Sequence, residues 1–260
     1  MARNIKSKRI VIKIGTNVIS DRKGSIDLAL MRSLVGQIAK IKNHREIVII
    51  TSGAIGAGMR ELKLNSRPND VTMRQVCAAV GQNILMSNYH TMFSKHDIKI
   101  AQILLTYKDF SDAKTYKNLH NSLGRMLGLG IIPIINENDP ISIDEIGPSF
   151  GDNDALSALI ATKIKADLLV ILTNVNGLFT KKPNSRGAAL VKEVRNIDKK
   201  IESMAGVPSQ LGIGGMKTKV DAARIATSNG AAAIIANGRA QDVLVKIIKN
   251  QEIGTLFYAK

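Results

Sequence analysis

Hydrophobic residues recur along the chain in short runs that are apolar throughout rather than alternating with polar residues. Such runs predict strands covered on both faces, because each face of the strand then needs apolar side chains. Six runs of this kind are present: Arg9–Ile14, 46–51, 98–106, 131–136, 167–173 and 231–237. The last apolar segment, GTLFYA at 254–259, predicts a strand that closes one edge of the sheet.

Segments with helical spacing of apolar residues separate these strands. They cover 27–42, 70–93, 116–130, 154–164 and 216–229. Strands that alternate with helices predict an α/β fold with a mainly parallel sheet and helices on both of its faces. No Pro/Gly-rich linker and no repeat divides the chain, so a single domain over 1–260 is expected.

Composition limits the function classes. The 260 residues carry a formal net charge of +16, which admits nucleic acid, an anionic membrane surface or anionic small molecules as partners. Aromatic residues make up only 3% and Trp is absent, so platforms for base stacking are scarce and a nucleic-acid role is disfavoured. No apolar run approaches the roughly 20 residues of a membrane span, and the N-terminal sequence does not resemble a signal peptide. The single cysteine, Cys77, predicts a buried structural thiol in a reducing cytoplasm.

Two glycine-containing loops follow the first two predicted strands. In KIGTN, Lys13 ends a strand and Gly15 allows close approach of the backbone, as a phosphoryl-binding turn requires. In TSGAIGAGM, Ser52 and Gly53 precede a predicted helix start, where backbone N–H groups bind anions. A surface lysine and an ordinary tight turn remain the alternative interpretations.

A third loop, LGIGGMKTK at 211–219, places Lys217 and Lys219 in the first turn of a predicted helix. Helix dipoles favour lysine at the opposite end, so lysines here indicate a polyphosphate ligand. A flexible loop with solvated lysines is the alternative. The chain contains no P-loop, H-E-x-x-H or C-x-x-C motif, which argues against a P-loop enzyme or a zinc site.

The stretch NENDPISIDEIGPSFGDND at 136–154 holds six acidic residues and neither Lys nor Arg. Part of GDND is expected to cap the helix that follows, and capping needs one residue only. Amide and carboxylate side chains together suit a ligand that carries both an ammonium and a carboxylate, with the amide NH₂ groups on the carboxylate and an Asp on the ammonium. The stretch therefore predicts a site for an amino acid.

Seven segments in this order resemble the glutamate 5-kinases of the amino acid kinase family: VIKIGTNVI, TSGAIGAG, AAVGQ, IPIINEND, FGDNDALSA, ADLLVILTNVNGLF and GIGGMKTKVDAA. INEND followed by FGDND is the most specific pair. The resemblance implies a three-layer αβα sandwich, with an N-terminal substrate-binding lobe and a C-terminal nucleotide-binding lobe. It also implies ATP-dependent phosphorylation of the γ-carboxylate of L-glutamate, the first step of proline biosynthesis, with Mg²⁺ bridging the phosphates of ATP.

The resemblance assigns roles to residues of this chain. The implied catalytic residues are Lys13, Lys219 and Asp154, with Asp154 holding the two lysines in position. The implied glutamate-binding residues are Ser52, Gly53, Asn136, Asp139 and Asn153. The implied nucleotide-binding residues are Lys13, Thr173, Asn174, Ile213, Gly214, Gly215, Met216, Lys217, Thr218 and Lys219.

Other expectations follow from the same resemblance. Proline is expected as a feedback inhibitor sensed by the segment 140–149, and a homo-oligomer is expected. Three departures, Ile213, Asn174 and Lys182, bear on nucleotide affinity. Because the sequence ends at Lys260, the C-terminal PUA domain that many bacterial members carry is expected to be absent. A related kinase with another acceptor, or a basic nucleic-acid-binding protein on a degenerate kinase fold, remains the alternative.

Overall fold

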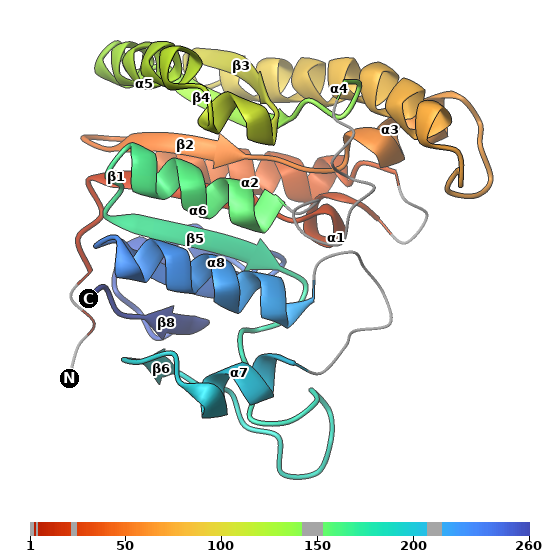
Figure 1. Ribbon diagram of the computed structural model, residues 1–260. Helices are drawn as coiled ribbons and strands as arrows, with labels where there is room; N and C mark the ends of the chain where they lie inside the picture. The colour runs from red at the N-terminus through yellow and green to blue at the C-terminus, as the bar shows by residue number, and fades with distance from the viewer. Residues whose placement is uncertain (1–2, 4, 22–24, 142–152, 207–214) are drawn as a thin grey trace.

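A computed structural model describes residues 3, 5–21, 25–141, 153–206 and 215–260, which fold around one eight-stranded sheet (Figure 1). The strands are β1 (Arg9–Ile14), β2 (Glu46–Ile50), β3 (Ile100–Leu105), β4 (Ile132–Glu137), β5 (Leu168–Thr173), β6 (Glu193–Val194), β7 (Ala232–Asn237) and β8 (Thr255–Phe257). Their order is β3-β4-β2-β1-β5-β7-β8-β6. Neighbouring strands are parallel except β7 and β8.

Helices connect the parallel strands. They are α1 (Thr16–Ile19), α2 (Leu28–Ile41), α3 (Ala54–Glu61), α4 (Val71–Ser94), α5 (Ala113–Gly128), α6 (Asn153–Lys163), α7 (Lys199–Ala205), α8 (Met216–Ser228) and α9 (Val243–Ile248), with a 3₁₀ helix at Tyr107–Phe110. Four of them begin after an aspartate whose side chain accepts from a backbone N–H of the first turn: Asp27, Asp70, Asp112 and Asp198. These caps satisfy donors that a helix start leaves unpaired, so the helices begin at these residues.

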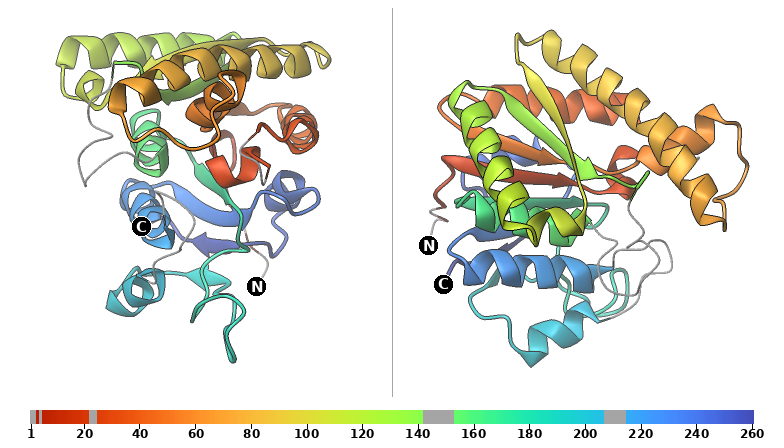
Figure 2. Two further views of the ribbon diagram at one scale, coloured as in Figure 1. Left: turned by 90° about the vertical axis from the view of Figure 1, so that its right-hand side faces the viewer. Right: turned by 45° about the horizontal axis from the view of Figure 1, so that its top comes forward.

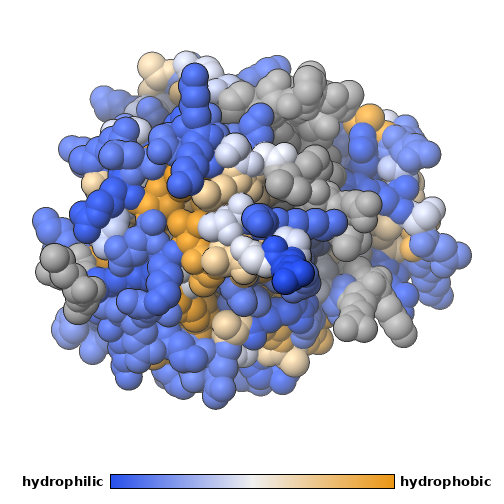
Figure 3. Space-filling model, turned by 90° about the horizontal axis from the view of Figure 1, so that it is seen from below, coloured by the Kyte–Doolittle hydropathy of each residue, from blue (hydrophilic) through white to orange (hydrophobic). Residues whose placement is uncertain are grey.

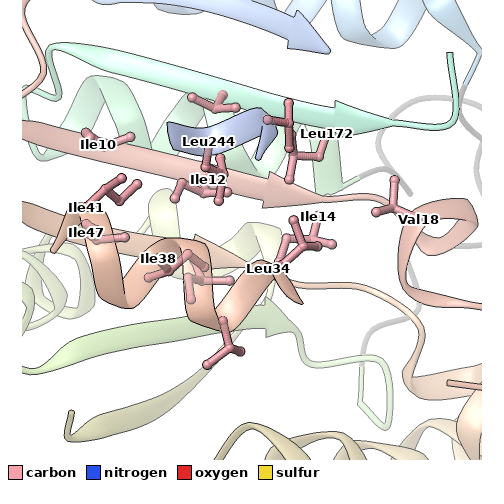
Figure 4. Close-up of a cluster of buried hydrophobic side chains, with 14 of the residues drawn as sticks. Ile10, Ile12, Ile14, Val18, Leu34, Ile38, Ile41, Ile47, Leu172 and Leu244 are labelled. Carbon is pink, nitrogen blue, oxygen red and sulfur yellow. The ribbon is translucent and has the colours of Figure 1, made fainter. Parts of the chain in front are cut away.

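The sheet is the middle of three layers (Figure 2). One core lies between the sheet and α2, α4 and α9, and it contains Ile10, Ile12 and Ile14 of β1 (Figure 4). The other core lies between the sheet and α5, α6, α7 and α8, and it contains Val11. Alternate residues of one strand thus enter opposite cores, which is why the strands are apolar throughout. The predicted αβα sandwich with a mainly parallel sheet is confirmed.

The predicted strands and helices are present, with ends that shift by a few residues. The prediction for the last strand was wrong in one respect, because β8 lies between β7 and β6 rather than at the edge. The strand at this edge of the sheet is β6, which has only two residues and therefore leaves no apolar run in the sequence. Helices α1, α7 and α9 were also missed, since they have only four, seven and six residues.

Helices α3 and α4 pack with almost no space between their backbones. A Cβ built on Gly58 of α3 would lie 1.8 Å from the carbonyl oxygen of Cys77, and one built on Gly81 of α4 would lie 1.8 Å from that of Ala54. Glycine at both positions lets the two helices approach this closely. The contact fixes α4 relative to the loop that precedes α3.

Cys77 is fully buried at this helix contact, as predicted, and burial raises the pKa of its thiol. Among the described residues, no helix has the length and apolar character needed to cross a membrane. Hydrophilic side chains cover most of the face seen from the β6 side, with a band of hydrophobic ones among them (Figure 3).

Candidate active site

Lys13 is an almost fully buried lysine near the end of β1. Its backbone is in register with Ile50 of β2 and Ile171 of β5, so it stands in the middle of the sheet. Alternation along β1 points its side chain to the same side as Val11, the side covered by α6 and α8. A charge in this position requires a partner from one of those helices.

Asp154, in the first turn of α6, is the partner of Lys13. Its Oδ1 lies 2.7 Å from Nζ of Lys13, and its Oδ2 lies 2.9 Å from Nζ of Lys219 in α8. The hydroxyl of Thr218 also donates to Oδ2, at 2.8 Å. One carboxylate thus joins β1, α6 and α8, and a helix cap alone would not require these partners.

The three charges are buried together: Asp154 is inaccessible to solvent, and the side chains of Lys13 and Lys219 are 4% and 8% exposed. Burial by itself raises the pKa of the Asp154 carboxyl, but the attraction of Lys13 and Lys219 outweighs burial and holds that pKa well below its ordinary range. Asp154 is therefore ionised at neutral pH. The cluster carries two positive charges and one negative charge, and the positive excess suits an anionic ligand.

A second group of polar side chains lies beside this cluster, at the carboxyl ends of β2 and β4. The Asn153 Nδ2 group donates to the Thr51 carbonyl at 3.0 Å, to Ser52 Oγ at 3.0 Å and to Asn136 Oδ1 at 3.1 Å. The structure thereby brings together Ser52, Asn136 and Asn153, which were predicted from separate segments. Gly53 follows Ser52 with φ of 97°, a left-handed conformation that favours glycine.

Sequence reasoning missed two residues of this group. Gln82 of α4 accepts a hydrogen bond from Nδ2 of Asn136 at 2.9 Å, and the Tyr89 hydroxyl lies 3.0 Å from Thr51 Oγ1. Both are largely or fully buried polar side chains in a helix whose other buried residues are mostly apolar. A polar residue at the end of the otherwise apolar AAVGQ segment is the feature of the sequence that could have indicated Gln82.

The remaining predicted residues lie at or after the ends of β4 and β5 and at the start of α8. Asp139 is half-buried in the turn after β4, Thr173 is the last residue of β5, and Asn174 is exposed beside it. Gly215, Met216 and Lys217 form the start of α8, with Lys217 exposed. Ile213, Gly214 and the segment 142–152 lie outside the described residues. Within the described part of the chain, no three His, Cys, Asp or Glu side chains gather as a metal site.

Comparison with known proteins is decisive for the family. The model of the amino acid kinase family matches residues 8–237, which include every segment of the site. The chain belongs to the amino acid kinase family. Members similar to it include the glutamate 5-kinases of Methanosarcina acetivorans, 46% identical, and of Dehalococcoides mccartyi strain CBDB1, also 46% identical. The alignments cover 97% and 96% of this chain, and 68% of each relative.

Solved structures of amino acid kinase folds superpose over nearly the whole chain. Carbamate kinase from Giardia lamblia bound to AMP-PNP gives a TM-score of 0.70 at 16% identity, covering 98% of this chain and 99% of that one. UMP kinase from Ureaplasma parvum gives 0.64 at 15% identity, covering 98% and 100%. At this identity the likeness establishes the fold alone.

Proposed function

We propose that this member of the family transfers the γ-phosphoryl group of ATP to the γ-carboxylate of L-glutamate, as the first step of proline biosynthesis. The observation that carries the proposal is the buried Lys13–Asp154–Lys219 cluster, which adjoins a group of amide side chains at the carboxyl ends of the central strands. Ligands of open α/β sheets bind at this edge. The similarity to glutamate 5-kinases over nearly the whole chain supports the choice of glutamate as acceptor.

In the proposed mechanism, Lys13 and Lys219 flank the transferred phosphoryl group and stabilise the negative charge on its oxygens. Phosphoryl transfer depends mainly on such positioning and charge neutralisation. Asp154 touches neither substrate and acts as a positioning residue, because it holds both ammonium groups at fixed distances of 2.7 and 2.9 Å. Without it, two buried like charges would repel each other.

No general base is required at this site. The γ-carboxylate of glutamate is ionised at neutral pH, so it attacks the γ-phosphorus of ATP without losing a proton. The bond from that phosphorus to the bridging oxygen breaks in the same step, and ADP leaves. The ammonium groups of Lys13 and Lys219 are a donor set that fits phosphate oxygens. Mg²⁺ bound to the phosphates of ATP would neutralise further charge there. Thr173, Asn174 and the start of α8 are the proposed neighbours of the nucleotide, and the strands beyond β5 the proposed nucleotide lobe.

The proposed glutamate site is the group formed by Ser52, Gly53, Asn136, Asp139 and Asn153, at the ends of β2 and β4. Asp139 is proposed to bind the α-ammonium, since it supplies a carboxylate in the turn that follows β4 and its residue Asn136. Cytoplasmic location, assembly into a homo-oligomer and feedback inhibition by proline complete the proposal. They rest on the resemblance to glutamate 5-kinases.

An acceptor survey tests the proposal. ATP consumption would be measured with glutamate, aspartate, acetylglutamate and uridylate in turn, with Mg²⁺ present. We expect turnover with glutamate and formation of an acyl phosphate, which hydroxylamine converts to a hydroxamate. A Lys13→Met variant should lose the activity, which excludes a contaminating kinase. Turnover on any other acceptor but not on glutamate would overturn the proposal.

A further inference from the structure

Hydrogen bonds connect the amide side chains of the proposed glutamate site into a chain with a defined direction. The backbone carbonyl of Thr51 can only accept, so the group of Asn153 that lies 3.0 Å from it must be the NH₂ group. The same NH₂ group faces Asn136 at 3.1 Å, so the side of Asn136 that faces Asn153 must be its oxygen. The orientation of both asparagines therefore follows from one peptide carbonyl.

The direction continues into α4. With its oxygen turned to Asn153, Asn136 presents its NH₂ group to Gln82 at 2.9 Å, so Gln82 must present its oxygen. The Nε2 group of Gln82 is thus left as the free end of the chain. Gln82 is only 6% exposed, and in the part of the chain that the structure describes its Nε2 has no hydrogen-bond partner. Buried donors are almost always paired, so this group calls for a ligand.

The free end is a donor, and the chemistry of the site selects its partner. The two hydrogens of the Asn153 NH₂ group already have three protein acceptors within 3.1 Å, so this donor group is engaged within the protein, whereas the Oδ1 of Asn153 has no hydrogen-bond partner among the described residues. A substrate carboxylate therefore needs another donor. Gln82 provides one, and its backbone is fixed by the close contact of Gly81 with α3.

We propose that Gln82 binds the α-carboxylate of the amino-acid substrate through its Nε2 group. This inference rests on the proposed function. The γ-carboxylate must reach Lys13 and Lys219, next to Asp154 and hence next to Asn153. Gln82 is linked to Asn153 only through Asn136, so it lies farther from the two lysines than Asn153 does. At that position it would contact the α-carboxylate end of the substrate. Gln82 is then a specificity residue that distinguishes a free α-carboxylate from a neutral group in its place.

The substitution Gln82→Glu tests the role with little change in shape. The glutamate side chain keeps an oxygen for Asn136 but loses the donor and gains a negative charge. Steady-state kinetics would compare two acceptors: L-glutamate and its α-amide, which keeps the γ-carboxylate and has a neutral group in place of the α-carboxylate. We expect the KM for glutamate to rise about tenfold to a hundredfold, the loss of one hydrogen bond to a charged group. The KM for the α-amide should change less than about threefold.

Asn83 provides the matched control, because it is the neighbouring residue of α4 and is exposed. Asn83→Asp makes the same change of amide to carboxylate and should leave both KM values unchanged. Should the Gln82→Glu chain not fold, Gln82→Met replaces it, since it is uncharged and similar in volume, and the same comparison of acceptors applies.

The outcomes separate the two proposals. Selective loss of glutamate relative to its α-amide supports the role of Gln82. Equal losses for both acceptors, or no loss, overturn that role and leave Gln82 as a structural residue, even if the unmodified protein phosphorylates glutamate. An unmodified protein that does not phosphorylate glutamate overturns the proposed function and the role of Gln82 with it.

Discussion

Gly58 lies so close to Cys77 that a Cβ on the glycine would stand 1.8 Å from the cysteine carbonyl oxygen. Gly81 and Ala54 repeat this relationship one turn along the same pair of helices. The two contacts clamp α3 to α4, and α4 carries Gln82. The spacing between these helices therefore affects both the stability of the fold and the amide chain of the proposed site.

Gly81→Ala should destabilise the protein by about 1–3 kcal/mol, the usual cost of overpacking, because the obstructing atom belongs to the backbone and cannot rotate away. Gly124→Ala in α5 is the control, since nothing lies within 4 Å of a Cβ there. That change should instead stabilise by about 0.5–1 kcal/mol, the helix preference for Ala over Gly. Urea unfolding of the two variants and the parent measures both. A Gly81→Ala protein as stable as the parent would show that the close contact between α3 and α4 does not require glycine at this position.

Asp154→Asn should lower kcat by about a hundredfold, the effect of misplacing a reacting group by about 1 Å, with little change in the KM for glutamate. The physical reason is that Asn cannot hold two ammonium groups by charge. Steady-state kinetics with glutamate and ATP varied in turn measure the effect. A variant with near-normal kcat would show that catalysis does not depend on Asp154 holding the two lysines in place.

The same substitution has a pH signature in stability. Removing one partner of a buried ion pair costs about 3–5 kcal/mol. At pH 6–7 the free energy of unfolding of the parent should therefore exceed that of Asp154→Asn by this amount. The folded protein lowers the pKa of Asp154, so its contribution is full above the ordinary value of about 3.9 and is lost as the pH falls below it. The difference in free energy of unfolding between the parent and Asp154→Asn should therefore become smaller below about pH 4. Urea unfolding from pH 7 to pH 3.5 tests this.

Asp112→Asn is the control for that experiment. Asp112 is an exposed helix cap whose carboxyl pKa is lowered by its hydrogen bonds to Thr115. Asn caps a helix about as well as Asp, so the free energies of unfolding of Asp112→Asn and of the parent should differ little at every pH. A gap for Asp154→Asn that is independent of pH would show that its carboxylate is not the source of the stability.

Asp139→Asn should raise the KM for glutamate by about tenfold to a hundredfold and leave kcat nearly unchanged. The reason is the loss of a hydrogen bond to a charged group, about 1.5–3 kcal/mol, at about 1.4 kcal/mol per tenfold. Glutamate saturation curves at fixed ATP give both constants. If Asp139→Asn and Asp154→Asn changed the same constant by similar amounts, the distinction between binding and positioning would be refuted.

Changes at Asp144 or Glu145 should weaken proline inhibition more than glutamate binding, because the acidic segment 140–149 is proposed to sense the inhibitor. Both residues lie outside the described part of the structure, so this expectation rests on the sequence. Inhibition by proline at several glutamate concentrations would be compared for Asp144→Asn, Glu145→Gln and the parent. Equal losses of inhibition and of glutamate binding would contradict it.

The sequence predicted those features that can be recognised from the residues of a single segment. The strand Arg9–Ile14 is apolar on both faces, and the parallel sheet follows from that pattern. Lys13, Asp154 and Lys219 were predicted one by one from strand and helix ends and from the resemblance. Their distances were not predictable, since they depend on how β1, α6 and α8 meet across the sheet.

Other features had no local signal. The position of β8 inside the sheet depends on β6, whose two residues pair with a strand more than sixty residues away. Gln82 looked like one polar residue in a long helix, and only the register of Asn136 on β4 shows which partner it faces. The clamp of Gly58 and Gly81 likewise depends on two helices meeting, because glycine in a helix by itself indicates only weaker helix propensity.

The place of β1 between β2 and β5 has a consequence for the protein during its synthesis. One edge of β1 can pair with β2 once residues up to 50 have left the ribosome, but the other edge has no partner until β5 at Leu168–Thr173 is made. At about 5–20 residues per second, the ribosome needs about 6–24 s to make the intervening chain. During that interval the nascent chain carries an open strand edge, and until residue 154 is made Lys13 also lacks its aspartate partner. A chaperone that covers exposed strand edges should bind ribosome-held chains that end between β2 and β5, and should release those that extend past α8.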